Sequence, residues 1–330
     1  MANISLPGSV KVGEGGGAAP LPSLKGFAPT KRTFWQQVGH DIKKSNKWGY
    51  VFITPLVIDF LIFTVYLIVH AFIYSFQDIE FGKITWVGLA NYRTMFNTPA
   101  FYYSIKNTIV YVLFTVPGGI FLAVIFSEFI FRRSTAVQTF YKSAYYLPVV
   151  VSSVALALVW VFIYQPFNGI LNFFTGLFGM APNAWLGNPA TAMPAIVAMN
   201  IIQGLGGSIV FITAAMGGIS PELYDAAKMD GASDWQRLWS VTVPLLRPTL
   251  LYLFVVGFIG NFQVFDQIYV MTAGGPGYPG STLTIGYLIY SAAFSSFNIG
   301  IAAAESIALF VVIVIVSVFQ FRFFSGETEY

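Results

Sequence analysis

The sequence predicts an all-α, polytopic membrane protein, because it is too apolar for a water-soluble fold and its apolar residues form long stretches. Hydrophobic residues make up 56% of the 330 residues, charged residues make up 9%, and the mean hydropathy is +0.70. A soluble domain carries roughly 25% charged residues. The chain has no cysteine and only His40 and His70, which excludes disulfides, thiolate metal sites and multi-histidine metal sites. The net charge of +3 is too small to indicate a nucleic-acid partner.

Six stretches are long and apolar enough to cross a membrane as helices. A spanning helix needs about 20 mostly apolar residues, because every backbone polar group in hydrocarbon must be hydrogen-bonded within its own segment. The predicted spans are residues 48–76, 105–131, 140–164, 192–216, 249–271 and 299–321.

These spans divide the chain into three parts. Residues 1–47 are basic and rich in Gly and Pro, which predicts a largely disordered tail, and they lack the apolar core and cleavage site of a signal peptide. Residues 48–324 form the predicted transmembrane domain, and residues 325–330 form a short tail.

The distribution of basic residues predicts the orientation, because Lys and Arg stay on the cytoplasmic side of a membrane. If the amino terminus is inside, only Lys83, Arg93 and Lys106 of the 17 Lys and Arg residues fall in outer segments. An even number of spans then places both termini in the cytoplasm.

The cytoplasmic segment between the fourth and fifth spans predicts two short helices. Pro221 suits a first helical position, where its missing N–H costs nothing, and Gly231 supplies a left-handed stop. Ser233 and Gln236 match a capping box for a second helix, which we expect Pro244 to end. Both helices are too short to span and have an apolar edge. They therefore pack against the rest of the protein, the membrane surface or a soluble partner.

The same segment carries a family motif. It reads Asp225-Ala226-Ala227, three residues, Gly231, nine residues, and then Val241-Thr242-Val243-Pro244. This resembles the E-A-A-x3-G-x9-I-x-L-P signature of binding-protein-dependent ABC import permeases, with Asp for Glu and Val for Ile and Leu. Further stretches resemble the maltose/glycerol-phosphate/lactose-type branch, and they are Asp230-Gly231-Ala232-Ser233, Thr272-Ala273-Gly274-Gly275-Pro276, Gly300 through Ser306, Gln320-Phe321-Arg322 and Val87-Gly88-Leu89-Ala90-Asn91-Tyr92. Together they cover residues 48–324.

The resemblance implies the six-helix fold of an ABC type I importer permease. In this family, the segment at about residues 220–244 is a pair of coupling helices that sits in a cleft of a cytoplasmic ATPase subunit. By position, Asp225 would meet a basic residue of the ATPase, and Gly231 would set the bend. The residues implied in coupling are Asp225, Ala226, Ala227, Asp230, Gly231 and Pro244. The alternative is an amphipathic loop with a self-contained role.

Amides, aromatic residues and glycines gather in the fourth and fifth spans. Amides exchange hydrogen bonds with sugar hydroxyls, and aromatic rings stack on sugar C–H faces. The alternative is that these glycines and amides make close helix contacts and interhelical hydrogen bonds. The resemblance favours substrate binding, since maltose-type permeases place their contacts on these two helices. The predicted contacts are Asn200, Gln203, Gly204, Gly207, Asn261, Phe262, Gln263 and Val264.

The resemblance implies a permease that translocates a carbohydrate delivered by an extracytoplasmic binding protein, in a bacterial or archaeal plasma membrane. Its partners would be a second, related permease subunit, two ATPase subunits, the binding protein and membrane lipid. The chain lacks a G-x4-G-K-[S/T] phosphate-binding loop, and we find no catalytic constellation in it. We therefore expect that it is not an enzyme and binds no cofactor, and that ATP and Mg²⁺ are held by the ATPase subunits.

Three carboxylates within the predicted spans support a rival function. An ionisable group in hydrocarbon costs roughly 2.5 to 3.5 kcal/mol, so Asp59, Asp266 and Glu305 each need a reason. They either bond to donors inside the helix bundle or form the relay of an ion- or proton-coupled secondary transporter. The lack of an evident inverted repeat weakens the second interpretation. A scaffold that binds partners without transporting a solute is a further alternative.

Overall fold

The computed structural model describes residues 47–80, 83–275, 277 and 280–324. It separates into two compact units, residues 1–61 and residues 62–330, which are described one at a time. Both predicted tails lie outside the described residues, except for Lys47. In the first unit, helix α2 (Lys47–Phe60) contains Pro55 and is exposed from Gly49 to Phe60.

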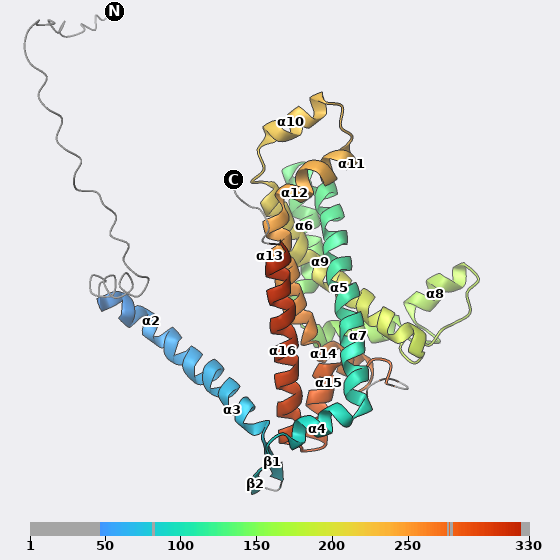
Figure 1. Cartoon of the computed structure of the whole chain (residues 1–330). Helices are drawn as coiled ribbons and strands as arrows, with labels where there is room; N and C mark the ends of the chain where they lie inside the picture. The colour runs from blue at the N-terminus through green and yellow to red at the C-terminus, as the bar shows by residue number, and fades with distance from the viewer. Residues whose placement is uncertain (1–46, 81–82, 276, 278–279, 325–330) are drawn as a thin grey trace, which may run out of the picture. The chain divides into compact units, whose positions relative to one another are not determined.

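The second unit is almost entirely helical, with one small antiparallel hairpin among its described residues (Figure 1). The first elements after α2 are η1 (a π-helical turn, Leu61–Val65), α3 (Tyr66–Tyr74), β1 (Gln77–Glu80), β2 (Lys83–Trp86), α4 (Ala90–Asn97), α5 (Pro99–Phe131), α6 (Thr135–Val150), α7 (Ser153–Ile163) and α8 (Ile170–Leu177). They are followed by α9 (Pro189–Met216), α10 (Pro221–Met229), α11 (Asp234–Arg237), the π-helical turn η2 (Leu238–Thr242), α12 (Val243–Leu245), α13 (Arg247–Phe262), α14 (Asp266–Met271), α15 (Ile285–Tyr290), the π-helical turn η3 (Ser291–Ser295) and α16 (Ile299–Phe324).

Within the described residues, four helices are long and apolar enough to cross a membrane. Two further pairs of bent helices could each form one span, which would give up to six. The four are Gly49–Tyr74, Pro99–Phe131, Pro189–Met216 and Ile299–Arg322. They correspond to the first, second, fourth and sixth predicted spans. The predicted helical membrane architecture is therefore confirmed, and by length and composition the described residues offer four to six candidate crossings.

The third and fifth predicted spans are not straight helices. The third is divided into α6 and α7, which are bent by 98° at the extended residues Val151 and Ser152. Pro148 lies in the last turn of α6, where it removes one helical hydrogen bond and weakens the end of the helix. The fifth is divided into α13 and α14, and residues 263–265 between them are not helical.

Helices α5 and α9 form the centre of the second unit, and their facing sides supply much of its core. Tyr111 of α5 and Ile196 and Met199 of α9 have no exposed surface (0%). Close approach of α6 to α9 depends on Gly206, because a Cβ atom there would overlap the backbone carbonyl of Tyr145. A small residue at a helix contact is typical of helix packing in membranes.

The end of the second unit opposite α10 carries the hairpin and α4 (Figure 1). In the hairpin, Gln77 pairs with Trp86. The Asn91 side-chain N–H groups donate to the carbonyl oxygens of Ser75 at 3.0 Å and Gln77 at 2.9 Å. Gly300, at the start of α16, lies directly against Asn91 and the Gln77 carbonyl, without room for a Cβ atom. Two of the stretches that carry the family resemblance therefore meet at this end.

Candidate solute pocket and coupling segment

The first predicted coupling helix is α10, and it begins and ends as the sequence predicts. The Ser220 side chain accepts a hydrogen bond from the backbone of the first turn, and Pro221 occupies an initial helical position. Gly231 has a φ of +76°, a left-handed conformation that favours glycine. The Ala232 N–H closes the turn by donating to the Ala227 carbonyl at 2.9 Å. The predicted left-handed stop is confirmed.

The second predicted coupling helix is α11, and it has the predicted capping box. The Gln236 N–H donates to Ser233 Oγ at 3.3 Å, and the Ser233 N–H donates to Gln236 Oε1 at 2.8 Å. The prediction that Pro244 ends this helix is wrong, because η2 and α12 continue it to Leu245 and the 72° bend follows. In the π-helical turn the Val243 N–H donates to the Leu238 carbonyl five residues earlier, and Pro244 takes an initial position of α12, where no N–H is needed.

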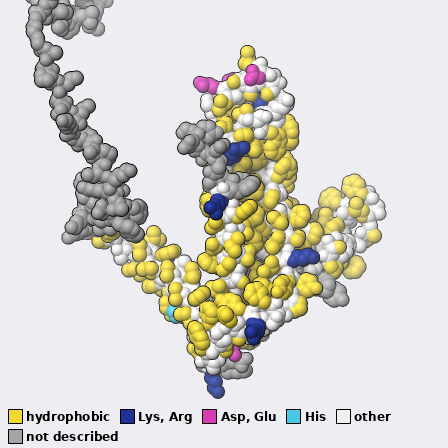
Figure 2. All heavy atoms as spheres, in the orientation of Figure 1, with side chains coloured by type: hydrophobic (Ala, Val, Ile, Leu, Met, Phe, Trp, Pro, Cys, Tyr) yellow, Lys and Arg dark blue, Asp and Glu magenta, His cyan; other side chains and the backbone are white. Residues whose placement is uncertain are grey.

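Helix α10 projects from one end of the second unit (Figure 1), and none of its residues is buried. Its Asp225 and Lys228 side chains are exposed and form an ion pair at 3.7 Å. The Tyr224 hydroxyl hydrogen-bonds the Thr242 hydroxyl of η2 at 3.2 Å. Acidic side chains gather at this end of the unit (Figure 2). Of the predicted coupling residues, Asp225, Ala226, Asp230 and Gly231 are exposed, whereas Ala227 and Pro244 are half-buried.

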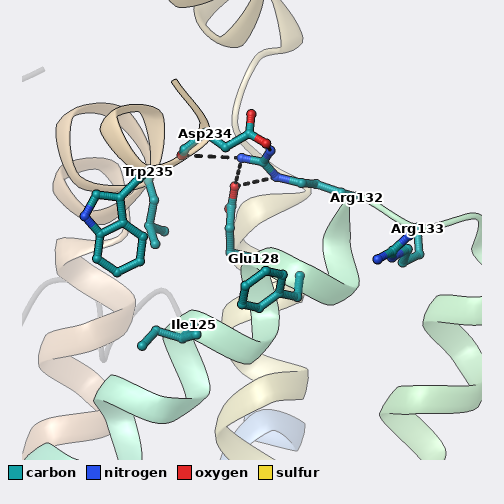
Figure 3. Close-up of a pocket in the computed structure, with 8 residues that line it drawn as sticks. Ile125, Glu128, Arg132, Arg133, Asp234 and Trp235 are labelled. Atoms are coloured by element: carbon teal, nitrogen blue, oxygen red, sulfur yellow. Dashed lines mark hydrogen bonds and ion pairs between the residues drawn. The ribbon is translucent and has the colours of Figure 1, made fainter. Parts of the chain in front are cut away.

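Three charged side chains, Glu128, Arg132 and Asp234, join α11 to the end of α5 (Figure 3). Arg132, directly after α5, pairs with Glu128 one turn earlier and with Asp234 of α11. Its Nε–H donates to Glu128 Oε1 at 2.7 Å. Asp234 also pairs with Arg237, whose side chain is 9% exposed. The hydrogen bond from Arg132 lowers the pKa of the Asp234 carboxyl below its ordinary value. These contacts hold α11 at the end of α5, beside a hollow of about 340 Å³.

A hollow of about 440 Å³ lies at the break between α13 and α14. It brings together four of the predicted substrate contacts, namely Asn200 of α9, Asn261 of α13, and Gln263 and Val264 of the break. Because α9 and α13 are separated by the whole coupling segment in the sequence, their meeting here is a result of the fold. We call this hollow the solute pocket.

The solute pocket is also lined by residues that the sequence analysis did not select. They are Tyr111, Gly260, Phe265, Asp266 and Gln267. Phe265, Asp266 and Gln267 directly follow the amide and aromatic run at residues 261–264, so extending that run would have included them. Tyr111 lies on α5, and a single phenol in an apolar span carries no signal that distinguishes a pocket wall from a core position.

In the solute pocket, the side-chain oxygen atoms of Asn261 and Gln263 are available to accept hydrogen bonds. Asn261 Nδ2 donates to the Gly257 carbonyl at 2.9 Å, and Gln263 Nε2 donates to the Ile259 carbonyl at 3.1 Å. Both bonds hold the side chain against its own helix. Among the described residues, the Asn200 side chain makes no hydrogen bond, and the two amide oxygens accept none. These groups can therefore bond to a solute that carries hydroxyls.

The break beside the pocket is supported by the segment that leads into α15. Thr284 is fully buried, and its hydroxyl donates to the Val264 carbonyl at 3.3 Å. Gly286 approaches the same carbonyl so closely that a Cβ atom would lie 2.6 Å from it. The Ile285 N–H in turn donates to Thr108 Oγ1 of α5 at 3.0 Å. Non-helical backbone within a membrane domain requires partners of this kind, because hydrocarbon supplies none.

The other four predicted contacts do not line the solute pocket. Gly204 and Gly207 have open space where a Cβ atom would be, so close helix packing does not require glycine there. Gln203 is half-buried, and its side-chain oxygen has no hydrogen-bond partner among the described residues. Phe262 is 5% exposed and lies in the core between α5 and α16, with Ile105 and other apolar residues.

The three carboxylates that a secondary transporter would use have different surroundings. Asp266 is exposed and lines the solute pocket, whereas Asp59 is exposed on α2 of the first unit. Glu305 is 4% exposed within α16, and its Oε2 has no hydrogen-bond partner among the described residues. Only Asp266 of the three lines the solute pocket. In the part of the chain that the structure describes, no group of three or more His, Asp and Glu residues could hold a metal ion.

The fold and these two regions define a multi-pass membrane protein with a polar pocket between its helices and an exposed helix pair at one end. Residues 115–326 match the family described as the binding-protein-dependent transport system inner membrane component. The chain belongs to this family, and the membership that the sequence motif predicted is confirmed.

Individual relatives extend the comparison over most of the chain. The chain is 30% identical over 313 residues to the arabinooligosaccharides transport system permease protein AraP of Bacillus subtilis, covering 93% of this chain and 96% of the relative. It is 31% identical over 275 residues to the trehalose/maltose transport system permease protein MalF of Thermococcus litoralis, covering 82% and 91%.

A solved structure shares the fold. The chain is similar, with a TM-score of 0.77 and 24% identity, to a chain of a bacterial ABC transporter involved in the import of the acidic polysaccharide alginate, covering 89% of this chain and 99% of the other. The predicted ABC importer permease fold is thereby confirmed.

Proposed function

We propose that this chain is one permease subunit of an ABC importer that carries a carbohydrate across the plasma membrane of a bacterium or archaeon. The observation that carries the proposal is the solute pocket, where amides and two aromatic rings meet in a largely apolar helical unit. Amides exchange hydrogen bonds with hydroxyls, and a ring face accepts sugar C–H groups. The names of the relatives AraP and MalF, which refer to arabinooligosaccharides and to trehalose and maltose, support a carbohydrate.

The pocket favours a neutral carbohydrate over an acidic one. Asp266 is exposed in the pocket wall, and a carboxylate only accepts hydrogen bonds. No Lys or Arg is among the lining residues to compensate an anionic solute. Because like charges placed together oppose binding, a uronic acid would bind less tightly than its neutral analogue.

The partners follow from the proposed role. A second, related permease would complete the path, two ATPase subunits would bind the α10 helices, and an extracytoplasmic binding protein would deliver the solute. A second solved structure similar to this chain is an alginate transporter in complex with a binding-protein partner, described as an alginate pentasaccharide-bound periplasmic protein. The basic residues that flank the predicted spans support two cytoplasmic termini and a cytoplasmic position for α10.

The ATPase subunits would supply the energy, with ATP and Mg²⁺ bound there and no cofactor on this chain. Asp225 would pair with a basic residue of the ATPase, and the small side chains of Ala226 and Ala227 would allow close approach. Binding of ATP and of the loaded binding protein would bias the permease pair toward an outward-open state, and hydrolysis would return it to an inward-open state. This chain would itself carry out no chemical step.

The test is uptake by the purified complex in proteoliposomes. The complex contains this chain, its permease and ATPase partners and the binding protein, and the solutes are labelled neutral di- and oligosaccharides. We expect uptake that requires ATP on the ATPase side and continues when ionophores dissipate ion gradients. Uptake by this chain without ATPase subunits, driven by an ion gradient, would instead establish the secondary transporter. Partner binding without any uptake would establish the scaffold.

A further inference from the structure

The ion pair between Arg132 and Asp234 connects two segments that are about 100 residues apart in the sequence (Figure 3). Arg132 caps the end of α5, and its Nε–H bond to Glu128 fixes the guanidinium along that helix. Nη1 of the same guanidinium pairs with Oδ2 of Asp234, the first residue of α11. A planar guanidinium can hold two carboxylates at once because it carries five N–H donors in a fixed arrangement.

Asp234 is shared by two arginines. Besides Arg132, it pairs with Arg237, which is almost fully buried and whose Nε has no partner among the described residues. A buried guanidinium needs a compensating carboxylate, so Arg237 keeps Asp234 in place. Glu128, Arg132, Asp234 and Arg237 thus form a chain of alternating charges from α5 to α11.

The coupling segment also contacts α5 through an aromatic pair, because the Trp239 ring of η2 stacks on Phe121 of α5 with the ring centroids 6.3 Å apart. None of the residues of α10 is buried, and its Tyr224 bonds to Thr242 within the coupling segment itself. Leu238, directly after α11, is 2% exposed and packs into the apolar core. Among the described residues, the ion pair between this segment and α5 is that of Arg132 with Asp234.

Helix α5 also reaches the solute pocket. Tyr111 of the same continuous helix lines that pocket, and at a rise of 1.5 Å per residue it lies about 32 Å along the axis from Arg132. Helix α5 packs along α9, which contributes Asn200 to the pocket. A movement of the end of α5 therefore has a direct structural route to the pocket wall.

We propose that Arg132 is a positioning residue that locks α11 to α5, so that a displacement of the coupling helices moves α5 and reshapes the solute pocket. This inference rests on the proposed importer function and adds to it the residue that transmits the movement. The pair is partly exposed, with side-chain exposures of 32% for Arg132 and 71% for Asp234. Partly exposed ion pairs add little to stability, so breaking this one changes geometry more than folding.

The experiment compares variants in the reconstituted complex. Arg132→Gln removes the charge, Arg132→Lys keeps it, and Arg133→Gln is the matched control, because Arg133 forms no ion pair with another described residue and lies apart from the contacts (Figure 3). The readouts are assembly yield, basal ATPase activity, and the stimulation of that activity by solute-loaded binding protein.

We expect Arg132→Gln to assemble and to keep basal ATPase activity while losing stimulation by about fivefold or more. Arg132→Lys should recover part of the stimulation, because it keeps the charge but not the fixed set of donors, and Arg133→Gln should keep all of it. Arg132→Met is the second variant, for use if Arg132→Gln fails to assemble; it also removes the charge, leaves the pair of Asp234 with Arg237 in place, and should show the same loss.

Three results would overturn the inference: full stimulation in the uncharged variants, a loss in Arg132→Lys as large as in Arg132→Gln, or an equal loss in Arg133→Gln. Failure of the proposed function is a separate result, because it would appear as absence of ATP-dependent uptake in the complex with the unaltered chain.

Discussion

Gly206 of α9 lies against the backbone carbonyl of Tyr145 on α6, so that these two helices meet where no side chain separates them. A methyl group at Gly206 would overlap that carbonyl, and neither backbone can move without shifting its helix. The contact fixes α6, which leads into the 98° bend, against the central helix of the unit.

Gly206→Ala should therefore destabilise the protein, because overpacking against backbone typically costs about 1–3 kcal/mol. We expect a lower melting temperature in detergent. Gly204→Ala is the matched control, since nothing lies within 4 Å of its Cβ position. Equal melting temperatures for the two variants would contradict the packing role of Gly206.

Asn261→Leu and Asn200→Leu should weaken uptake without preventing assembly. Each removes a polar group from the solute pocket, and a neutral hydrogen bond contributes about 0.5–1.5 kcal/mol, so KM for uptake should rise about two- to tenfold. Gln203→Leu is the control on α9, because Gln203 lies outside the pocket lining. Unchanged KM in both Asn variants would remove the amides from the binding site.

Substitution of Gly231 should act through the backbone, because no atom lies within 4 Å of its Cβ position and its φ is +76°. A left-handed conformation costs an ordinary residue about 1–2 kcal/mol, less for Asn and more for a β-branched residue. Gly231→Val should therefore reduce binding-protein-stimulated ATPase activity, Gly231→Asn should largely preserve it, and membrane insertion should persist in both. The control is Gly218→Ala, which meets only ordinary contacts. The same activity in the Val and Asn variants would show that the turn does not control coupling.

Thr284→Val should loosen the break next to the solute pocket. It removes the hydroxyl that bonds the Val264 carbonyl and leaves a buried acceptor unsatisfied, at a cost of about 1–3 kcal/mol. Thr284→Ser retains the hydroxyl and serves as control. Hydrogen exchange of residues 263–268 should increase in the Val variant and stay near the unaltered rate in the Ser variant. Equal exchange in all three proteins would show that this hydrogen bond does not hold the break.

The local features of the coupling segment could be predicted from the sequence, because each depends on neighbouring residues. The positive φ of Gly231 and the capping box of Ser233 and Gln236 are examples. The continuation through Pro244 could not, because it depends on a π-helical turn that no residue pattern specified. The charge chain through Arg132 was also beyond prediction, since it joins residues distant in sequence.

The solute pocket could be predicted only in part, because its residues come from segments that are distant in the sequence. Amides within α9 and α13 marked two helices as polar, but composition does not show which face of a helix meets a pocket. Asn200 lines the pocket, while Gln203 and Gly204 of the same helix do not. The break at residues 263–265 also differs from the straight span that hydropathy favours, because a hydropathy average registers apolar content and not helical continuity.

The helix break at residues 263–265 affects how the solute specificity of such a permease can change. Where one helix stops and another starts, the Gln263 and Val264 N–H groups donate to the Gly260 and Asn261 carbonyls, and the Val264 carbonyl accepts from Thr284. The shape of the break is thus held by main-chain bonds and by Thr284, so replacements at Asn261, Gln263 or Phe265 can alter which solute fits while the break itself persists.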